Sequence, residues 1–159
     1  MGRFVFHVPR PDCLAPGAVE RAYLASMDGI PWECSCQWDD GILAIERDTR
    51  ESGNLYFCWN VPGRGQVMLC SGSLMERDRP YNLPVELARG TINRLRNQAA
   101  TWLAAGMEIP RKFEELSSRA ALVFASAAIG QQQPERAGER AEEAIRISLE
   151  AADLLVQNY

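Results

Sequence analysis

Residues 80–106 have the sequence PYNLPVELARGTINRLRNQAATWLAAG, and this stretch decides the fold. Asn82 has a side chain that caps helices, and Pro84 suits a first helical turn. Apolar residues then recur every three or four positions: Val85, Ala88, Ile92, Leu95, Ala99 and Trp102. A single apolar stripe with this period predicts an amphipathic helix over about residues 84–105, ended by Gly106.

The same period continues toward the C-terminus in two further segments. Pro110 and Gly130 bound a helix that we predict over residues 111–129. Pro134 opens a third helix over residues 134–157, and its stripe consists mainly of small residues: Ala137, Ala141, Ala144, Ser148, Ala151 and Leu155. The connecting loops are short, so neighbouring helices are expected to be antiparallel in a three-helix segment.

Upstream of Pro80 the period changes to two, with many Gly, Pro and aromatic residues between short alternating runs. Four runs predict strands: Arg3–Val8, Ile42–Arg47, Asn54–Val61 and Gln66–Ser71. We expect the last three to pair in sequence as an antiparallel meander. Residues 19–27 fit a strand better than a helix, although Pro16-Gly17 and Glu20-Arg21 also suit a helix start.

These patterns predict an α+β fold in two parts. Residues 1–79 would form a small, jelly-roll-like antiparallel β-sandwich domain, and residues 80–159 the helical segment. The third helix carries more apolar surface than one stripe needs: Ile145, Ile147, Leu149, Leu154 and Val156. A helix that is apolar on several sides must be covered, so we expect a dimer partner or a further part of a longer chain to pack on it.

Composition excludes several classes of protein. The chain has 159 residues, of which 47% are hydrophobic and 24% charged, which is typical of a globular protein. No run approaches the roughly 20 apolar residues that span a bilayer, so no membrane association is expected. Net charge is −4, and the arginines around residues 77–96 alternate with acidic residues, which predicts ion pairs and no nucleic-acid partner.

Five cysteines occur, an odd number that argues against a disulfide framework. The Cys34-Ser-Cys36 pair invites a metal site with Cys58, Cys70 and His7, but structural zinc sites usually repeat such a pair. We therefore favour buried small hydrophobic thiols, with no metal and no cofactor. The N-terminus lacks the apolar core of a signal peptide, which predicts a cytoplasmic protein and leaves export open.

No constellation of catalytic residues emerges from the chain. His7 is the single histidine and lies in a predicted strand, which suits a half-buried structural residue better than a catalytic triad. Gly63-Arg64-Gly65 is typical of a hairpin turn and not of a phosphate-binding loop. Asp39-Asp40 is likewise typical of a turn. We assign no catalytic residue.

The aromatic residues of the first half suggest a binding surface. In a strand over residues 54–61, Leu55, Phe57 and Trp59 share one face, which we expect to pack in the core. The opposite face would carry Asn54, Tyr56 and Asn60. We predict that these three residues bind carbohydrate together with Trp32 and Trp38. We expect Trp32 and Trp38 in nearby loops. Flat rings stack on sugars and amides bond their hydroxyls; alternatively, the tryptophans fill the sandwich core.

Residues 73–98, SLMERDRPYNLPVELARGTINRLRNQ, resemble a stretch of bacterial proteins that carry a glycoside hydrolase family 10 (xylanase-like) barrel. The resemblance extends to Glu46-Arg47, Ser52–Leu55, Gly65–Leu69, Ala141–Ala144 and Ala151–Leu155. It covers nearly the whole chain but only the region N-terminal to the barrel. The run from Pro80 to Gly90 is its most specific part.

The resemblance implies a non-catalytic accessory region whose last helix continues toward a C-terminal barrel. A (β/α)8 barrel needs more than 159 residues, and the two catalytic glutamates of the family belong to that barrel, so none is transferred to this chain. The expected function is accessory, with glycan binding through the surface aromatics. The alternative is a structural or oligomerising region without a ligand. Expected partners are the barrel of the same longer chain, polysaccharide, and a second copy through the helices.

Overall fold

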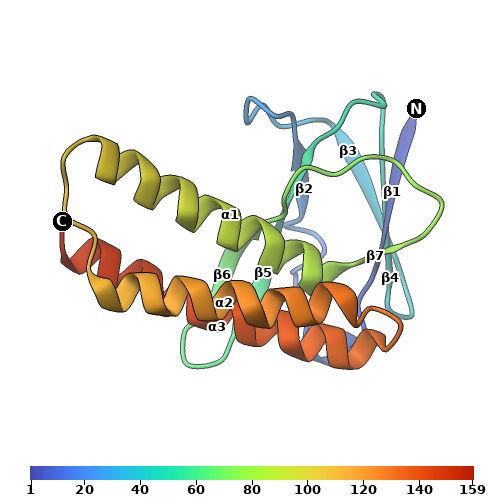
Figure 1. Ribbon diagram of the computed structural model, residues 1–159. Coiled ribbons are helices and arrows are strands. Elements are labelled where there is room, and N and C mark those ends of the chain that lie inside the picture. The colour runs from blue at the N-terminus through green and yellow to red at the C-terminus, as the bar shows by residue number, and fades with distance from the viewer.

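The computed structural model describes residues 1–159 and confirms the α+β class, with strands first and helices last (Figure 1). The strands are β1 (Gly2–His7), β2 (Tyr23–Ala25), β3 (Cys34–Asp39), β4 (Ile42–Arg47), β5 (Asn54–Val61), β6 (Gly65–Cys70) and β7 (Tyr81–Asn82). The helices are α1 (Leu83–Ala104), α2 (Arg111–Ile129) and α3 (Pro134–Gln157), besides a short 3-10 turn at Pro11–Cys13.

The strands form two sheets, in the orders β3-β4-β1-β7 and β2-β5-β6. All pairs are antiparallel except β1 with β7. Phe6 lies opposite Leu43, and Phe57 lies opposite Leu69. These four side chains are buried in one hydrophobic cluster. The inner faces of the two sheets therefore pack on each other, which is the arrangement of a sandwich.

The predicted meander is wrong at its first step, because β4 pairs with β1 and β3 and lies in a different sheet from β5. Only β5 and β6 pair in sequence as expected. Pairing β4 with β1 brings the inward residues Leu43 and Ile45 beside Phe6 and Phe4, which buries one continuous apolar face. Strand β3 was not predicted, and neither was β7, which lies at the start of the segment predicted to be helical.

The turn at Asp40-Gly41 explains how β3 joins β4. Both residues have positive φ, 39° and 84°, and Asp39 lies opposite Ile42. This is the backbone that a two-residue hairpin with right-handed strand twist requires. In the ambiguous segment 19–27, only Tyr23–Ala25 forms a strand, and turns precede it.

The three helices agree with the predicted ranges to within one residue. Asn82 caps α1, where its Oδ1 accepts a hydrogen bond from the Val85 amide. The small-residue stripe of α3 is buried throughout, which lets α2 and α3 lie close together along their length (Figure 1). No helix combines the length and the hydropathy that a membrane-spanning segment requires.

One hydrophobic cluster joins the two halves of the chain. It contains Phe4 and Phe57 from the sheets together with Leu87 from α1 and Ile145 and Ile147 from α3. The expectation that a partner must cover Ile145 and Ile147 is therefore wrong, because the chain's own core buries both. Near the C-terminus, Val156 stays exposed. The change from strands to helices thus falls between Asn82 and Leu83, just after the predicted boundary at residues 79/80, and it lies within a shared core.

Candidate functional site

The five residues predicted to bind carbohydrate do not form one surface. Leu55, Phe57 and Trp59 point into the core as expected, so Tyr56 and Asn60 lie on the outer face of the β2-β5-β6 sheet with Asn54. Trp38 lies in β3, not in a loop. It pairs with the inward residue Leu43 of β4, and both belong to the β3-β4-β1-β7 sheet. Trp38 and Tyr56 therefore belong to different layers of the sandwich.

Tyr56 is already engaged by two neighbours. Its ring stacks on Tyr23 of β2, with ring centroids 4.7 Å apart and planes 1° from parallel. Arg94 of α1 donates a hydrogen bond from Nη2 to the Tyr56 hydroxyl at 2.8 Å. One face of the Tyr56 ring is thus unavailable for stacking on a sugar, and the hydroxyl positions a cation.

Trp32 lies in a loop as expected, and its contacts are structural. The ring is half-buried against the core cluster, close to Gly53, where a Cβ would come within 2.5 Å of Trp32 Cζ3. Arg47 also lies near this ring, with its Cζ 5.7 Å from the Trp32 ring centroid. Trp32 therefore helps to close the end of the sandwich.

Arg47 is a buried cation that the strand pattern did not reveal. Its side chain is 3% exposed, its Cζ lies 3.7 Å from the centroid of the Phe4 ring, and its Nη2 donates to the Glu51 carbonyl at 2.9 Å. Nε and Nη1 have no partner in the chain. Burial lowers the pKa of Arg47. Arg47 belongs to the core, since aromatic rings cover it.

A mainly apolar groove lies between β6, α1 and α3, with a volume of about 440 Å³. We call it the β6 groove. Ten of its fourteen lining residues are hydrophobic, and the lining comprises Val67, Met68, Leu69, Cys70, Thr91, Arg94, Leu95, Gln98, Trp102, Ser148, Leu149, Ala152, Leu155 and Val156. The sequence did not predict it, because it exists only where segments 80 residues apart meet.

Most polar groups in the β6 groove are satisfied within the chain. The hydroxyls of Thr91 and Ser148 each donate to the carbonyl four residues earlier, at 2.7 Å. The Cys70 thiol faces the Ser71 carbonyl, and burial raises the pKa of Cys70. Arg94 is the one charged residue of the lining. Burial lowers the pKa of Arg94, but the contacts with Tyr56 and Cys70 outweigh this effect, so the pKa of Arg94 is raised overall.

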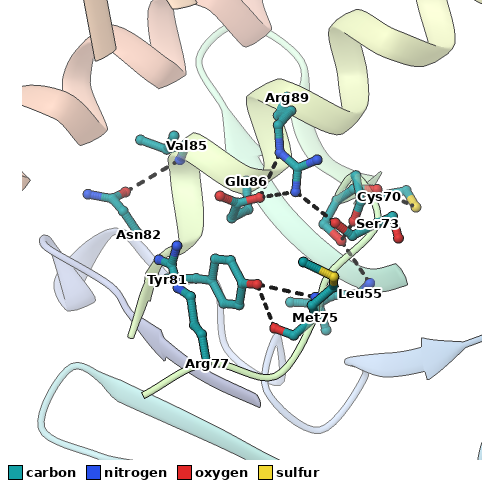
Figure 2. A network of polar contacts seen from close by, with 12 residues as sticks. Leu55, Cys70, Ser73, Met75, Arg77, Tyr81, Asn82, Val85, Glu86 and Arg89 are labelled. Atoms are coloured by element: carbon teal, nitrogen blue, oxygen red, sulfur yellow. Dashed lines mark hydrogen bonds and ion pairs between the residues drawn. The ribbon is translucent and has the colours of Figure 1, made fainter. Parts of the chain in front are cut away.

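A polar cluster fixes the start of α1 to the strands (Figure 2). Glu86 is 6% exposed, and its Oε2 accepts a hydrogen bond from Arg89 Nε at 2.9 Å. Arg89 Nη2 also donates to the Ser73 carbonyl at 3.0 Å. The Tyr81 hydroxyl donates to the Met75 carbonyl at 2.6 Å. With the carboxylate neutralised by arginine, this cluster is a structural clamp.

The perturbed acids support no acid–base chemistry. The backbone N–H of Arg3 holds the pKa of Glu76 below its usual value, and Arg64 does the same for Asp153. A general acid at neutral pH needs the opposite shift. No three His, Cys, Asp or Glu side chains converge on a metal position, and all five cysteines are free. Burial and Cys34 raise the pKa of Cys36 to about 11, so its thiol stays protonated at neutral pH.

The outer side of α2 is unusually apolar near its C-terminal end. Eight of the nine residues 121–129 are apolar, and Leu122 and Ile129 are 73% and 84% exposed. Together with Ala125 they lie on one side of the helix, because positions three, four and seven apart share a face. We call Leu122, Ala125 and Ile129 the α2 face.

No family model, curated protein or solved structure was found to match the chain.

Proposed function

We propose that the chain is a non-catalytic accessory region of a larger, xylanase-like glycoside hydrolase protein, and that its α2 face packs against a partner domain. The observation that carries this proposal is the exposure of Leu122 and Ile129 on one side of α2. Contiguous apolar surface on a helix is a mark of protein interaction sites. Burying the two side chains would stabilise a complex by about 2 kcal/mol each.

The partner in this proposal is the C-terminal barrel implied by the resemblance. Such barrels present an outer ring of helices, and a helix with small and apolar residues packs well on another helix. The α2 face offers Ala125 between Leu122 and Ile129, which would let a partner helix approach closely. The five free cysteines support a reducing, cytoplasmic location for the protein.

We expect Leu122→Arg with Ile129→Arg to disrupt docking while leaving the fold intact, because both side chains are exposed. The measurement is amide hydrogen exchange of α2 in the natural longer protein and in the 159-residue chain. In the longer protein, the double variant should raise exchange of α2 to the level of the isolated chain. The matched control, Asn97→Arg with Gln131→Arg, adds the same two charges at exposed positions outside the α2 face and should not change the exchange of α2.

Equal exchange of α2 in the longer protein and in the isolated chain would contradict docking on the barrel. A natural reading frame that ends at Tyr159 would also contradict it. Sedimentation of the isolated chain tests whether a second copy, and not the barrel, covers the α2 face. A dimer that dissociates in the double variant would assign the α2 face to self-association.

Glycan binding is a second candidate function, favoured by one remaining surface. Asn54 and Asn60 flank the stacked pair Tyr23–Tyr56 on the outer face of the β2-β5-β6 sheet. Amides beside an aromatic ring suit the hydroxyls and the C–H face of a sugar. This surface retains three of the five predicted residues and adds Tyr23.

Calorimetric titration with soluble xylan and other β-glucans tests this surface. We expect Tyr23→Ala to weaken binding about fivefold, since stacking on an aromatic ring contributes on the order of 1 kcal/mol. Asn60→Ala should also weaken it, whereas Trp38→Ala, on the other layer, should not. Absence of heat with every polymer would refute glycan binding, and loss only with Trp38→Ala would refute this location.

A further inference from the structure

We propose that the β6 groove binds one amphipathic carboxylate, with its headgroup at Arg94 and its apolar body between β6 and α3. This inference does not depend on docking through the α2 face, which lies on another helix. It rests on three features of the groove: its shape, its single cation and the saturation of its other polar groups.

The shape suits a small molecule. A volume of about 440 Å³ lies within the roughly 300–1,000 Å³ of small-molecule sites, which are mostly apolar with a few placed polar groups. Val67 and Leu69 line one wall, and Leu149 and Ala152 line the opposite one. A hydrocarbon body between these walls would remove apolar surface from water on both sides.

The charge selects an anion. None of the ion pairs in the chain includes Arg94, and no acidic residue lines the groove. By contrast, Arg64 and Arg89 are held by Asp153 and Glu86. The Tyr56 hydroxyl accepts a hydrogen bond from Arg94 Nη2, and the Cys70 side chain also interacts with this guanidinium. The N–H groups that these two contacts leave are available to a carboxylate.

The remaining polar groups leave one place for a headgroup. Thr91, Ser148 and Cys70 direct their hydrogens to backbone carbonyls, so they offer little to a ligand. Gln98 lies one helical turn beyond Arg94 and lines the same groove. Residues four apart share a helix face, so the Gln98 amide and the Arg94 guanidinium can both donate to one carboxylate.

Decanoate is the probe, followed by two-dimensional amide NMR of the whole 159-residue chain. We expect saturable one-to-one binding that shifts the Trp102 indole and the amides of Leu149 and Ala152. Decylammonium, which has the same tail and the opposite charge, should bind at least about tenfold more weakly, because a charge-assisted hydrogen bond is lost and repulsion is added.

Two variants locate the ligand. Arg94→Met keeps the length of the side chain and should weaken decanoate about tenfold or more, whereas Arg96→Met removes the same charge from the side of α1 that faces α2 and should have no effect. Ala152→Phe fills the groove from α3 and should abolish binding. The thermal midpoint of each variant shows whether it folds.

Several results would overturn the proposal. Equal affinity for decanoate and decylammonium, or an unchanged affinity in a folded Arg94→Met, would leave only unspecific apolar binding. Shifts confined to residues outside the groove would refute the site. A dimer in sedimentation that does not bind decanoate would assign the groove to a second copy, with Met68 and Val156 buried between the two copies. An extended peptide that pairs with the free edge of β6 and displaces decanoate would assign the groove to a protein segment.

Discussion

Gly90→Ala is expected to destabilise the fold by about 2–3 kcal/mol, although the same change usually stabilises a helix. Gly90 lies where α1 crosses the end of β6. A Cβ at this position would overlap with the Cys70 carbonyl oxygen and the Ser71 carbonyl carbon. Both are backbone atoms, so no side chain can move aside, and α1 would have to separate from the sheet.

Gly138→Ala is the matched control. Gly138 lies within α3, and a Cβ there would meet only side-chain carbons of Pro84 and Pro9 at 3.5 Å, which is ordinary van der Waals contact. The variant should therefore show the helix propensity alone, a gain of up to about 1 kcal/mol. Thermal unfolding measures both effects: the midpoint of Gly90→Ala should be about 5–10 °C lower than that of the unchanged chain, and the midpoint of Gly138→Ala slightly higher.

A Gly90→Ala protein as stable as the unchanged chain would mean that α1 is not held against β6. The β6 groove would then lose its geometry, since α1 forms one of its sides. Measuring decanoate binding in this variant under conditions where it is folded links the two tests. A shift of α1 should weaken the ligand even though no groove side chain has changed.

The helices could be predicted from the sequence because the signals that fix them are local. Asn82, Pro110 and Pro134 mark where helices start, and the three-four spacing between them marks the buried stripe. The inward face of β5 was predicted for the same reason, since alternation within one strand fixes which residues share a face. These features depend on residues a few positions apart.

Strand pairing could not be predicted in the same way. One of the two partners of β4 is β1, some 40 residues earlier, and this choice depends on which pairing buries Phe4, Phe6, Leu43 and Ile45 together. Strand β3 was missed because its residues Cys34–Asp39 include no β-branched side chain, although the turn at Asp40-Gly41 required a strand on each side.

The same contrast between local patterns and contacts of distant segments applies to the candidate sites. Alternation along β5 placed Tyr56 and Asn60 on one face, but no local pattern could show that Trp38 belongs to another layer. The β6 groove, the buried Arg47 and the contact of Tyr56 with Arg94 all join segments distant in sequence. The sequence shows which residue types occur at these places, but it does not show that these residues lie next to one another in the fold.

Arg89→Met is expected to destabilise the fold by about 2–3 kcal/mol, because it leaves the Glu86 carboxylate buried without its cation. Breaking a buried ion pair by removing one partner costs about 3–5 kcal/mol, and the partial exposure of Arg89 reduces this figure. The Ser73 carbonyl also loses a hydrogen bond. Urea unfolding at neutral pH measures the loss as a lower midpoint.

The double variant Glu86→Leu with Arg89→Met separates an unpaired charge from lost packing. If the buried carboxylate causes the instability, removing it as well should restore most of the stability, since an apolar pair of similar volume replaces an ion pair at little cost. If Arg89 acts mainly by holding Ser73, the double variant should remain as unstable as Arg89→Met.

Arg140→Met is the control, because Arg140 and Glu143 form an exposed pair with the same spacing, worth less than about 0.5 kcal/mol. An equal loss in Arg89→Met and Arg140→Met would show that the clamp at the start of α1 is hydrated and does not anchor the helix to the strands.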